Sequence, residues 1–208
     1  MRAAGFTHLK TSDDLVIPGT WVATSFIDGV ETLVPIDLIV PEAAANVRGR
    51  RAARLGAHGN IAARKSAGLE AVLVDHATMT IGALDPADLR SIDVEVAGVA
   101  ALIIAKLHKI HDRSSGRPDR LSDKDAADVY RIMQTTSVHD IATTLAELRD
   151  HPLAGQATSV ALEYLEELFG RRGRAGIVMA QRALQLAIPE AQVETLCVSF
   201  TSRLLALA

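Results

Sequence analysis

The sequence predicts an α+β protein in which a sheet region comes first and a helical region follows. Short runs with strand-like alternation fall in the first half, whereas apolar residues at three- and four-residue steps fall in the second half. The composition agrees, because 49% of the residues are hydrophobic but only 3% are aromatic, which favours helices around a core of small side chains. We expect a mixed sheet over residues 1–97 and a helical region over residues 98–208.

The composition also bounds the class of protein. A net charge of −3 excludes a chain that is basic throughout. The single cysteine, Cys197, excludes an internal disulfide framework, fits a reducing compartment and lies in an apolar run typical of a core helix. No signal peptide is visible, and no uncharged apolar run approaches the ~20 residues of a membrane span. We therefore expect a cytoplasmic protein with no membrane partner.

Two strand-like runs open the sheet region, at residues 20–26 and 31–40. Between them stands Asp28-Gly29, a hairpin signal. The second run contains Asp37 between apolar neighbours, an unusual place for an aspartate because carboxylates are poor strand formers. Asp37 is either a solvent-facing residue of the strand or a functional carboxylate.

A basic segment follows at residues 41–66, which we interpret as a loop or a short helix. No acidic residue occurs from position 43 to position 69. Clustered arginines there are either a solvated face or a contact for the phosphate backbone of RNA, to which guanidinium groups are well suited. The arginines predicted to bind RNA are Arg48, Arg50, Arg51 and Arg54.

The remaining elements are three short strands and a series of helices. The strands are expected at residues 71–74, 78–81 and 92–96, with Asp93 and Glu95 on an exposed side. Apolar periodicity, turn residues and helix-terminal signals then predict helices at the following positions: 98–113, 122–133, 138–150, 158–169, 175–187 and 189–207.

The first two of these helices carry the best candidate site. Lys106 falls within the apolar pattern of its helix, where an unpaired ammonium would be costly, and Asp125 and Asp128 share one face of the next helix. Ser122 resembles an N-cap, with Asp125 at the third position of a capping box. The lysine and the two aspartates therefore form either a functional cluster or a structural ion pair, with Asp125 capping its own helix.

A zinc site is a weaker alternative on the same helix. His108 and His111 are three residues apart, so their imidazoles share a face, but the sequence offers no third ligand at a suitable spacing. No nucleophile elbow, Walker A sequence or dinucleotide-binding glycine motif occurs.

Three segments resemble the nucleotidyltransferase toxins of the AbiEii type, which include the mycobacterial MenT proteins of type IV toxin–antitoxin systems. These segments read VPIDLIVP at 34–41, AKLHKIHDR at 105–113 and KDAADVYRIM at 124–133, and they occur in the family's order. By this resemblance, Asp37 is a metal-binding carboxylate of the sheet. Lys106 is a catalytic or nucleotide-contacting lysine, paired with Arg113 in a K-x-x-x-x-x-x-R pattern. Asp125 and Asp128 supply a further catalytic acid.

The resemblance implies a truncated nucleotidyltransferase-like sheet and transfer of nucleotides from a nucleoside triphosphate to RNA, with tRNA as the expected acceptor. It also implies Mg²⁺ as cofactor and a cognate antitoxin protein as partner. The family's Gly-Ser and D-x-D metal motif has no counterpart here, because no Gly-Ser dipeptide occurs and the only D-x-D is Asp123-Lys124-Asp125. Either the true start lies upstream, or the chain is a degenerate member of the family. Three hypotheses follow: an enzyme of this lineage, a catalytically dead module of the same fold that binds RNA or an antitoxin, and a helical interaction domain unrelated to the family.

Overall fold

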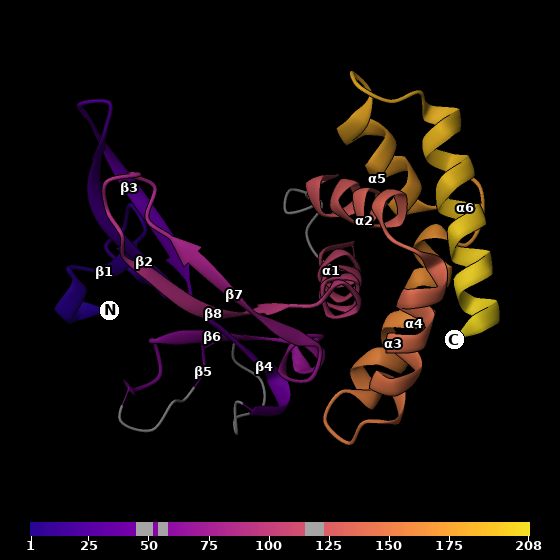
Figure 1. The fold of residues 1–208 in the computed structure, drawn as a ribbon, viewed down its shortest axis with the longest axis horizontal. Helices are drawn as coiled ribbons and strands as arrows, with labels where there is room; N and C mark the ends of the chain where they lie inside the picture. The colour runs from indigo at the N-terminus through magenta and orange to yellow at the C-terminus, as the bar shows by residue number, and fades with distance from the viewer. Residues whose placement is uncertain (45–51, 54–57, 115–122) are drawn as a thin grey trace. The chain divides into compact units, whose positions relative to one another are not determined.

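The computed structural model describes residues 1–44, 52–53, 58–114 and 123–208, in two compact units (Figure 1). The first unit is Met1–Ala67 and the second is Gly68–Ala208. Strands dominate the first unit and helices dominate the second, so the predicted α+β class is confirmed. The division between the units precedes the boundary at 97 and 98 expected from the sequence, because the segment after Gly68 packs on the helices.

In residues 1–44, 52–53 and 58–67, the first unit has two three-stranded sheets and the short 3-10 helices η1 and η2. One sheet has the order β1-β2-β3, and the other has the order β4-β6-β5. In the second sheet β4 and β6 are parallel while β5 and β6 are antiparallel, so this sheet is mixed. The elements are η1 (Arg2–Ala4), β1 (Thr7–Lys10), β2 (Val16–Ile27), β3 (Val30–Asp37), β4 (Ile39–Pro41), η2 (Glu42–Ala44), β5 (Ala52–Ala53) and β6 (Ala63–Ser66).

The predicted hairpin at Asp28-Gly29 is confirmed. Both residues have positive φ, 50° and 78°, as a type I′ turn requires, and Ile27 pairs with Val30 across it. The run expected as a single strand over 31–40 is wrong, because β3 ends at Asp37 and β4 joins the other sheet. The interruption falls at Leu38, whose N–H donates to the Gly19 carbonyl and whose carbonyl accepts from Arg64.

The prediction of a loop or short helix over 41–66 is confirmed at η2 but is wrong at Ala52–Ala53 and Ala63–Ser66, which form strands β5 and β6. β6 is a strand, and its residue Arg64 pairs with Ile39 of β4. A strand of the sequence Ala-Arg-Lys-Ser shows no apolar alternation, so only its pairing with distant residues identifies it. Gly19 permits this pairing, because an added Cβ there would lie 2.5 Å from the Arg64 nitrogen and 2.7 Å from the Leu38 oxygen.

In residues 68–114 and 123–208, the second unit begins with a 3-10 helix and a hairpin and continues as six α-helices. The strand expected at 71–74 is wrong, because this segment forms η4, in which neighbouring residues Glu70 and Ala71 are both buried. The elements are η4 (Glu70–Leu73), β7 (His76–Gly82), β8 (Ser91–Ala97), α1 (Val99–Ser114), α2 (Asp123–Thr135), α3 (Val138–Asp150), α4 (Gly155–Phe169), α5 (Ala175–Leu184) and α6 (Glu190–Leu207).

The predicted helices and the last two predicted strands are confirmed, with shifts of a few residues at some ends. The core of the second unit lies among the helices and includes a fully buried residue from each of five of them: Ile104, Tyr130, Leu165, Ile177 and Leu204. Leu145 of α3 is 1% exposed and joins the same core. Cys197 is buried there, as predicted.

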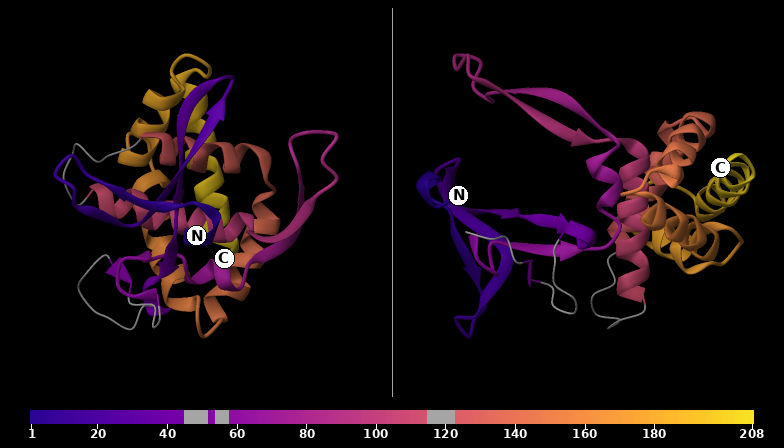
Figure 2. Two further views of the ribbon diagram at one scale, coloured as in Figure 1. Left: turned by 90° about the vertical axis from the view of Figure 1, so that its left-hand side faces the viewer. Right: turned by 90° about the horizontal axis from the view of Figure 1, so that it is seen from below.

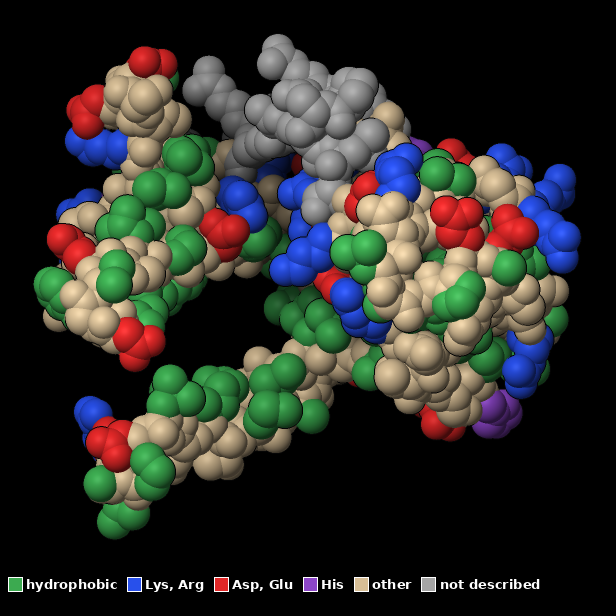
Figure 3. All heavy atoms as spheres, turned by 90° about the horizontal axis from the view of Figure 1, so that it is seen from above, with side chains coloured by type: hydrophobic (Ala, Val, Ile, Leu, Met, Phe, Trp, Pro, Cys, Tyr) green, Lys and Arg blue, Asp and Glu red, His purple; other side chains and the backbone are tan. Residues whose placement is uncertain are grey.

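The β7–β8 hairpin projects from these helices (Figure 2) and has one polar and one apolar face. On the polar face Thr78 and Thr80 donate to Glu95 and Asp93, both exposed as expected. On the other face Met79 stands opposite Val94. The hairpin is the slender arm at the bottom of Figure 3, where hydrophobic side chains run along one side of it.

The start of α1 is held by the segment that precedes the hairpin. The Asp75 carboxylate accepts a hydrogen bond of 2.8 Å from the Ala101 N–H, and the Asp75 carbonyl accepts one from Gly98. A carboxylate at this end of a helix satisfies an otherwise unpaired amide and complements the helix dipole. A Cβ at Gly98 would overlap the Asp75 carboxylate, so this arrangement requires glycine.

Candidate functional site

Helix α1 presents three cationic side chains on one face. Lys106, Lys109 and Arg113 follow one another at steps of three and four residues, which places them together on a helix surface. The rest of α1 is largely buried, with Leu107 and Ile110 each 1% exposed. The apolar face of α1 packs in the core, and its cationic face lies next to α2.

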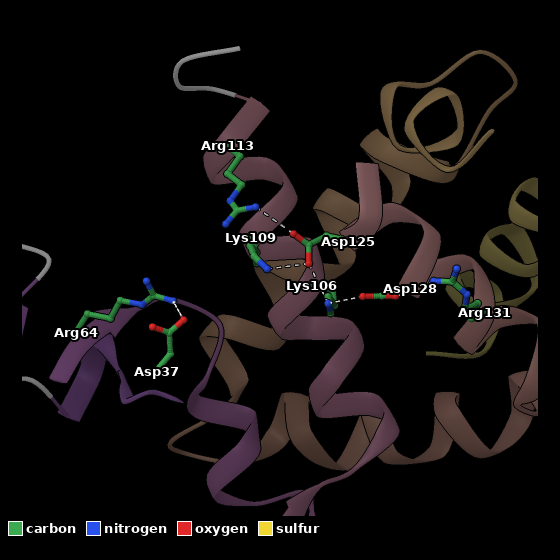
Figure 4. A network of polar contacts seen from close by, with 8 residues as sticks. All are labelled: Asp37, Arg64, Lys106, Lys109, Arg113, Asp125, Asp128 and Arg131. Carbon is green, nitrogen blue, oxygen red and sulfur yellow. Dashed lines mark hydrogen bonds and ion pairs between the residues drawn. The ribbon is translucent and has the colours of Figure 1, made fainter. Parts of the chain in front are cut away.

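Helix α2 supplies the two carboxylates that meet these cations (Figure 4). Asp125 accepts hydrogen bonds of 2.8 Å from Lys106 and Lys109 on one oxygen, and one of 3.3 Å from Arg113 on the other. Asp128 accepts from Lys106 at 2.7 Å. Its second oxygen accepts from Arg131 at 2.8 Å. We call Lys106, Lys109, Arg113, Asp125, Asp128 and Arg131 the α1–α2 cluster.

Burial differs sharply within the α1–α2 cluster. The Asp125 side chain is 4% exposed, whereas those of Lys106 and Lys109 are 24% and 42% exposed. Asp125 is therefore the buried centre of the cluster, and the cations around it reach solvent. Four cations share two carboxylates, so the cluster carries excess positive charge at neutral pH.

The ionisation of the central pair follows from these contacts. Burial alone would raise the pKa of Asp125, but hydrogen bonds from Lys106 and Lys109 outweigh it and hold that pKa below 3.8. Burial alone would lower the pKa of Lys106, but its hydrogen bonds to Asp125 and Asp128 outweigh it and raise that pKa above 10.5. Both groups are thus charged at neutral pH.

A separate ion pair anchors the start of α2. Arg182 of α5 donates two hydrogen bonds to the Asp123 carboxylate, of 2.9 Å and 2.8 Å. This two-pronged geometry fixes orientation as well as distance, and it lowers the pKa of Asp123. Helix α2 is therefore held from α5 as well as from α1.

The structure brings together four of the residues singled out from the sequence: Lys106, Arg113, Asp125 and Asp128. The carboxylate of Asp125 bonds to α1, and Ser122, its expected capping-box partner, lies outside the described residues. Sequence reasoning missed Lys109 and Arg131. Their spacing was a usable signal, since Lys109 stands three residues after Lys106 and Arg131 stands three after Asp128.

Asp37, the predicted metal ligand, lies in the first unit at the end of β3 and already has two partners. Its carboxylate accepts a hydrogen bond of 2.7 Å from Thr20 and one of 2.9 Å from Arg64. A divalent cation of the magnesium type prefers several oxygen ligands without a competing guanidinium. Within the described parts of the chain, no three His, Cys, Asp or Glu side chains form a group that could hold a metal ion. Asp37 therefore belongs to an ion pair with Arg64 in this structure, and Mg²⁺ as a cofactor stays a prediction.

The remaining predicted site residues are the arginines expected to bind RNA and the two histidines of the possible zinc site. Arg48, Arg50, Arg51 and Arg54 lie outside the described residues. His108 contacts the Ala157 carbonyl at 2.8 Å, and the His111 ring stacks on Tyr164 with centroids 3.7 Å apart. These two histidines of α1 therefore pack against α4.

No family model, curated protein or solved structure matches this chain. Among residues 1–44, 52–53, 58–114 and 123–208, no helix combines the length and apolar character that crossing a bilayer requires.

Proposed function

We propose that this chain is a nucleotidyltransferase-lineage toxin whose α1–α2 cluster binds the phosphates of a nucleoside triphosphate. Its proposed activity is nucleotide transfer to RNA, with tRNA as the expected acceptor, in the cytoplasm. The observation that carries the proposal is the placement of Lys106 between Asp125 and Asp128 within a cluster of excess positive charge. Partly exposed ammonium and guanidinium groups of this kind are suited to phosphate oxygens.

The proposed reaction forms one bond and breaks another at the α-phosphorus. A hydroxyl oxygen at the RNA end bonds to that phosphorus, its proton passes to water, and the bond from the α-phosphorus to the bridging oxygen breaks to release pyrophosphate. Lys109 and Arg113 are 42% and 35% exposed and would stabilise the negative charge that grows on the leaving group. Asp125 and Asp128 would hold Lys106 in position.

A second candidate function is a binding module without catalysis, which would contact RNA or an antitoxin protein. The ion pair between Asp37 and Arg64 favours it, because this carboxylate is already neutralised by a cation. The sequence also lacks the Gly-Ser and D-x-D motif that anchors metal in the family it resembles. Under this candidate the α1–α2 cluster would bind phosphates but would transfer nothing.

Label transfer separates the two candidates. Each α-labelled nucleoside triphosphate is incubated with total tRNA and magnesium, using the native chain, Lys106→Ala and Lys109→Ala. Arg203→Ala, an exposed cation on α6, serves as the charge-matched control. The enzyme proposal expects label on tRNA that is lost in both lysine variants and kept in the control. Absence of transfer by the folded native chain, together with retained tRNA binding on filters, would leave the binding module.

A further inference from the structure

The cationic face of α1 continues into an exposed apolar patch. Val99 and Leu102 are 40% and 39% exposed, although most apolar residues of this helix are buried. At about 100° per residue, Val99, Leu102, Lys106, Lys109 and Arg113 fall within an arc of about 80°. We call these five residues the α1 stripe. Its first turns are apolar and its later turns are cationic.

The two halves of the α1 stripe suit different chemical groups. The cationic half provides donors for an anion. Lys109 uses one of its three N–H donors within the α1–α2 cluster, and Arg113 uses one of its five. The apolar half offers aliphatic surface on which a flat aromatic group would lose contact with water. A ligand that covers the whole stripe therefore has an apolar end and an anionic end.

Lys106 stands where the two halves meet and is the least available of the three cations. It donates to both Asp125 and Asp128, and its side chain is 24% exposed. Phosphate contact therefore falls mainly to Lys109 and Arg113, one and two turns further along the helix.

We propose that a nucleoside triphosphate lies along the α1 stripe, with its base on Val99 and Leu102 and its phosphates on Lys109 and Arg113. The inference rests on the proposed function and adds the direction of the nucleotide and the residues that contact its base. Leu102 and Lys109 are seven residues apart, or about 10 Å along the helix axis. An extended nucleotide spans a distance of this order between its base and its terminal phosphates.

An inorganic polyphosphate or an RNA backbone would contact only the cationic half of the α1 stripe. Either ligand would contact the cations, but neither has an apolar group that would cover Val99 and Leu102. The base is therefore the group that distinguishes this proposal from simple attraction of anions to a positively charged surface.

The test compares inorganic tripolyphosphate with each of the four nucleoside triphosphates by titration calorimetry on the full chain. Leu102→Asn preserves side-chain size and introduces no charge, while Leu153→Asn, at a residue 57% exposed before α4, is the matched control. We expect Leu102→Asn to weaken the binding of the preferred nucleotide about five- to tenfold. Its affinity for tripolyphosphate should stay within about twofold of that of the native chain. Lys109→Ala should weaken the binding of tripolyphosphate and of the nucleotide to the same extent. Leu153→Asn should change neither affinity.

The outcomes distinguish the inference from the function on which it rests. Equal affinity for tripolyphosphate and every nucleotide, with no effect of Leu102→Asn, would overturn the base contact and leave phosphate binding by the α1–α2 cluster intact. No binding of either ligand to the folded chain would overturn both. Circular dichroism of each variant establishes that the helices are retained.

Discussion

Replacing Asp125 by asparagine removes the buried charge on which three cations converge. Asparagine keeps the size of the side chain and one acceptor oxygen. Its NH₂ group, however, takes the place of the second carboxylate oxygen and would face a cationic donor in place of an acceptor. Hydrogen bonds to charged groups contribute about 1.5–3 kcal/mol each, and removing one member of a buried ion pair costs about 3–5 kcal/mol. These values are upper bounds here, because Lys106, Lys109 and Arg113 are 24%, 42% and 35% exposed and can turn to water.

We therefore expect Asp125→Asn to lower the free energy of unfolding by about 2–3 kcal/mol at pH 7. Urea unfolding followed by circular dichroism at a helix-sensitive wavelength measures it, because the α-helices of the described residues all lie in the second unit. Asp112→Asn is the control, since Asp112 is an exposed carboxylate on the same helix as the three cations.

The pH dependence identifies charge as the cause. The pKa of Asp125 is lower in the folded protein than its ordinary value of 3.8, so its contribution is complete above that pH and is lost as the pH falls through the folded value. The pKa of Lys106 is raised above 10.5, so its contribution is complete below that pH and is lost as the pH rises through the folded value. The free energies of unfolding of the native chain and of Asp125→Asn should thus approach each other below pH 3.8. A difference that is equally large in acid would refute the electrostatic reasoning and indicate lost packing.

Three further predictions concern stability and reactivity in the second unit. Tyr130→Phe should raise the free energy of unfolding by about 1 kcal/mol, because the buried Tyr130 hydroxyl has no hydrogen-bond partner among the described residues; thermal melting checks this, and a lowered midpoint would contradict it. Gly98→Ala should cost about 1–3 kcal/mol in urea unfolding, because the new Cβ would displace the Asp75 carboxylate. Gly82→Ala, whose Cβ would meet nothing within 4 Å, should have no comparable clash. Cys197, whose pKa burial raises to about 12, should react with a thiol reagent only as fast as the protein unfolds, and rapid labelling of the native chain would show that it is accessible.

Local features of the sequence predicted most of the helical region. The helix Val138–Asp150 has the bounds expected from its apolar periodicity and from Pro152 beyond it, and Ser137 accepts a hydrogen bond from the Asp140 N–H at its start. Helix signals repeat within a few residues of chain, so they can be recognised without knowledge of the packing. The hairpin at Asp28-Gly29 was predictable for the same reason, since two adjacent residues with positive φ define its turn.

The candidate site was predictable in part. Lys106 in an apolar pattern implied a partner, and the spacing of Asp125 and Asp128 implied a shared face, so their meeting followed from the cost of burying an unpaired ammonium. Lys109 and Arg131 lie at exposed positions, where a charged residue requires no special explanation. Their membership of the α1–α2 cluster therefore became clear only from the contacts.

By itself, the sequence determined that strands come first and helices follow, the positions of the long helices, the hairpin turn at Asp28-Gly29 and the pairing of Lys106 with acids of the next helix. The tertiary structure alone decided that β6 is a strand, that the run 31–40 divides at Leu38 between two sheets, and that 71–74 is helical. It also decided that Asp37 is held by Arg64. Each of these depends on partners distant in the sequence, and pairing energies between distant segments leave little trace in the local pattern of either one.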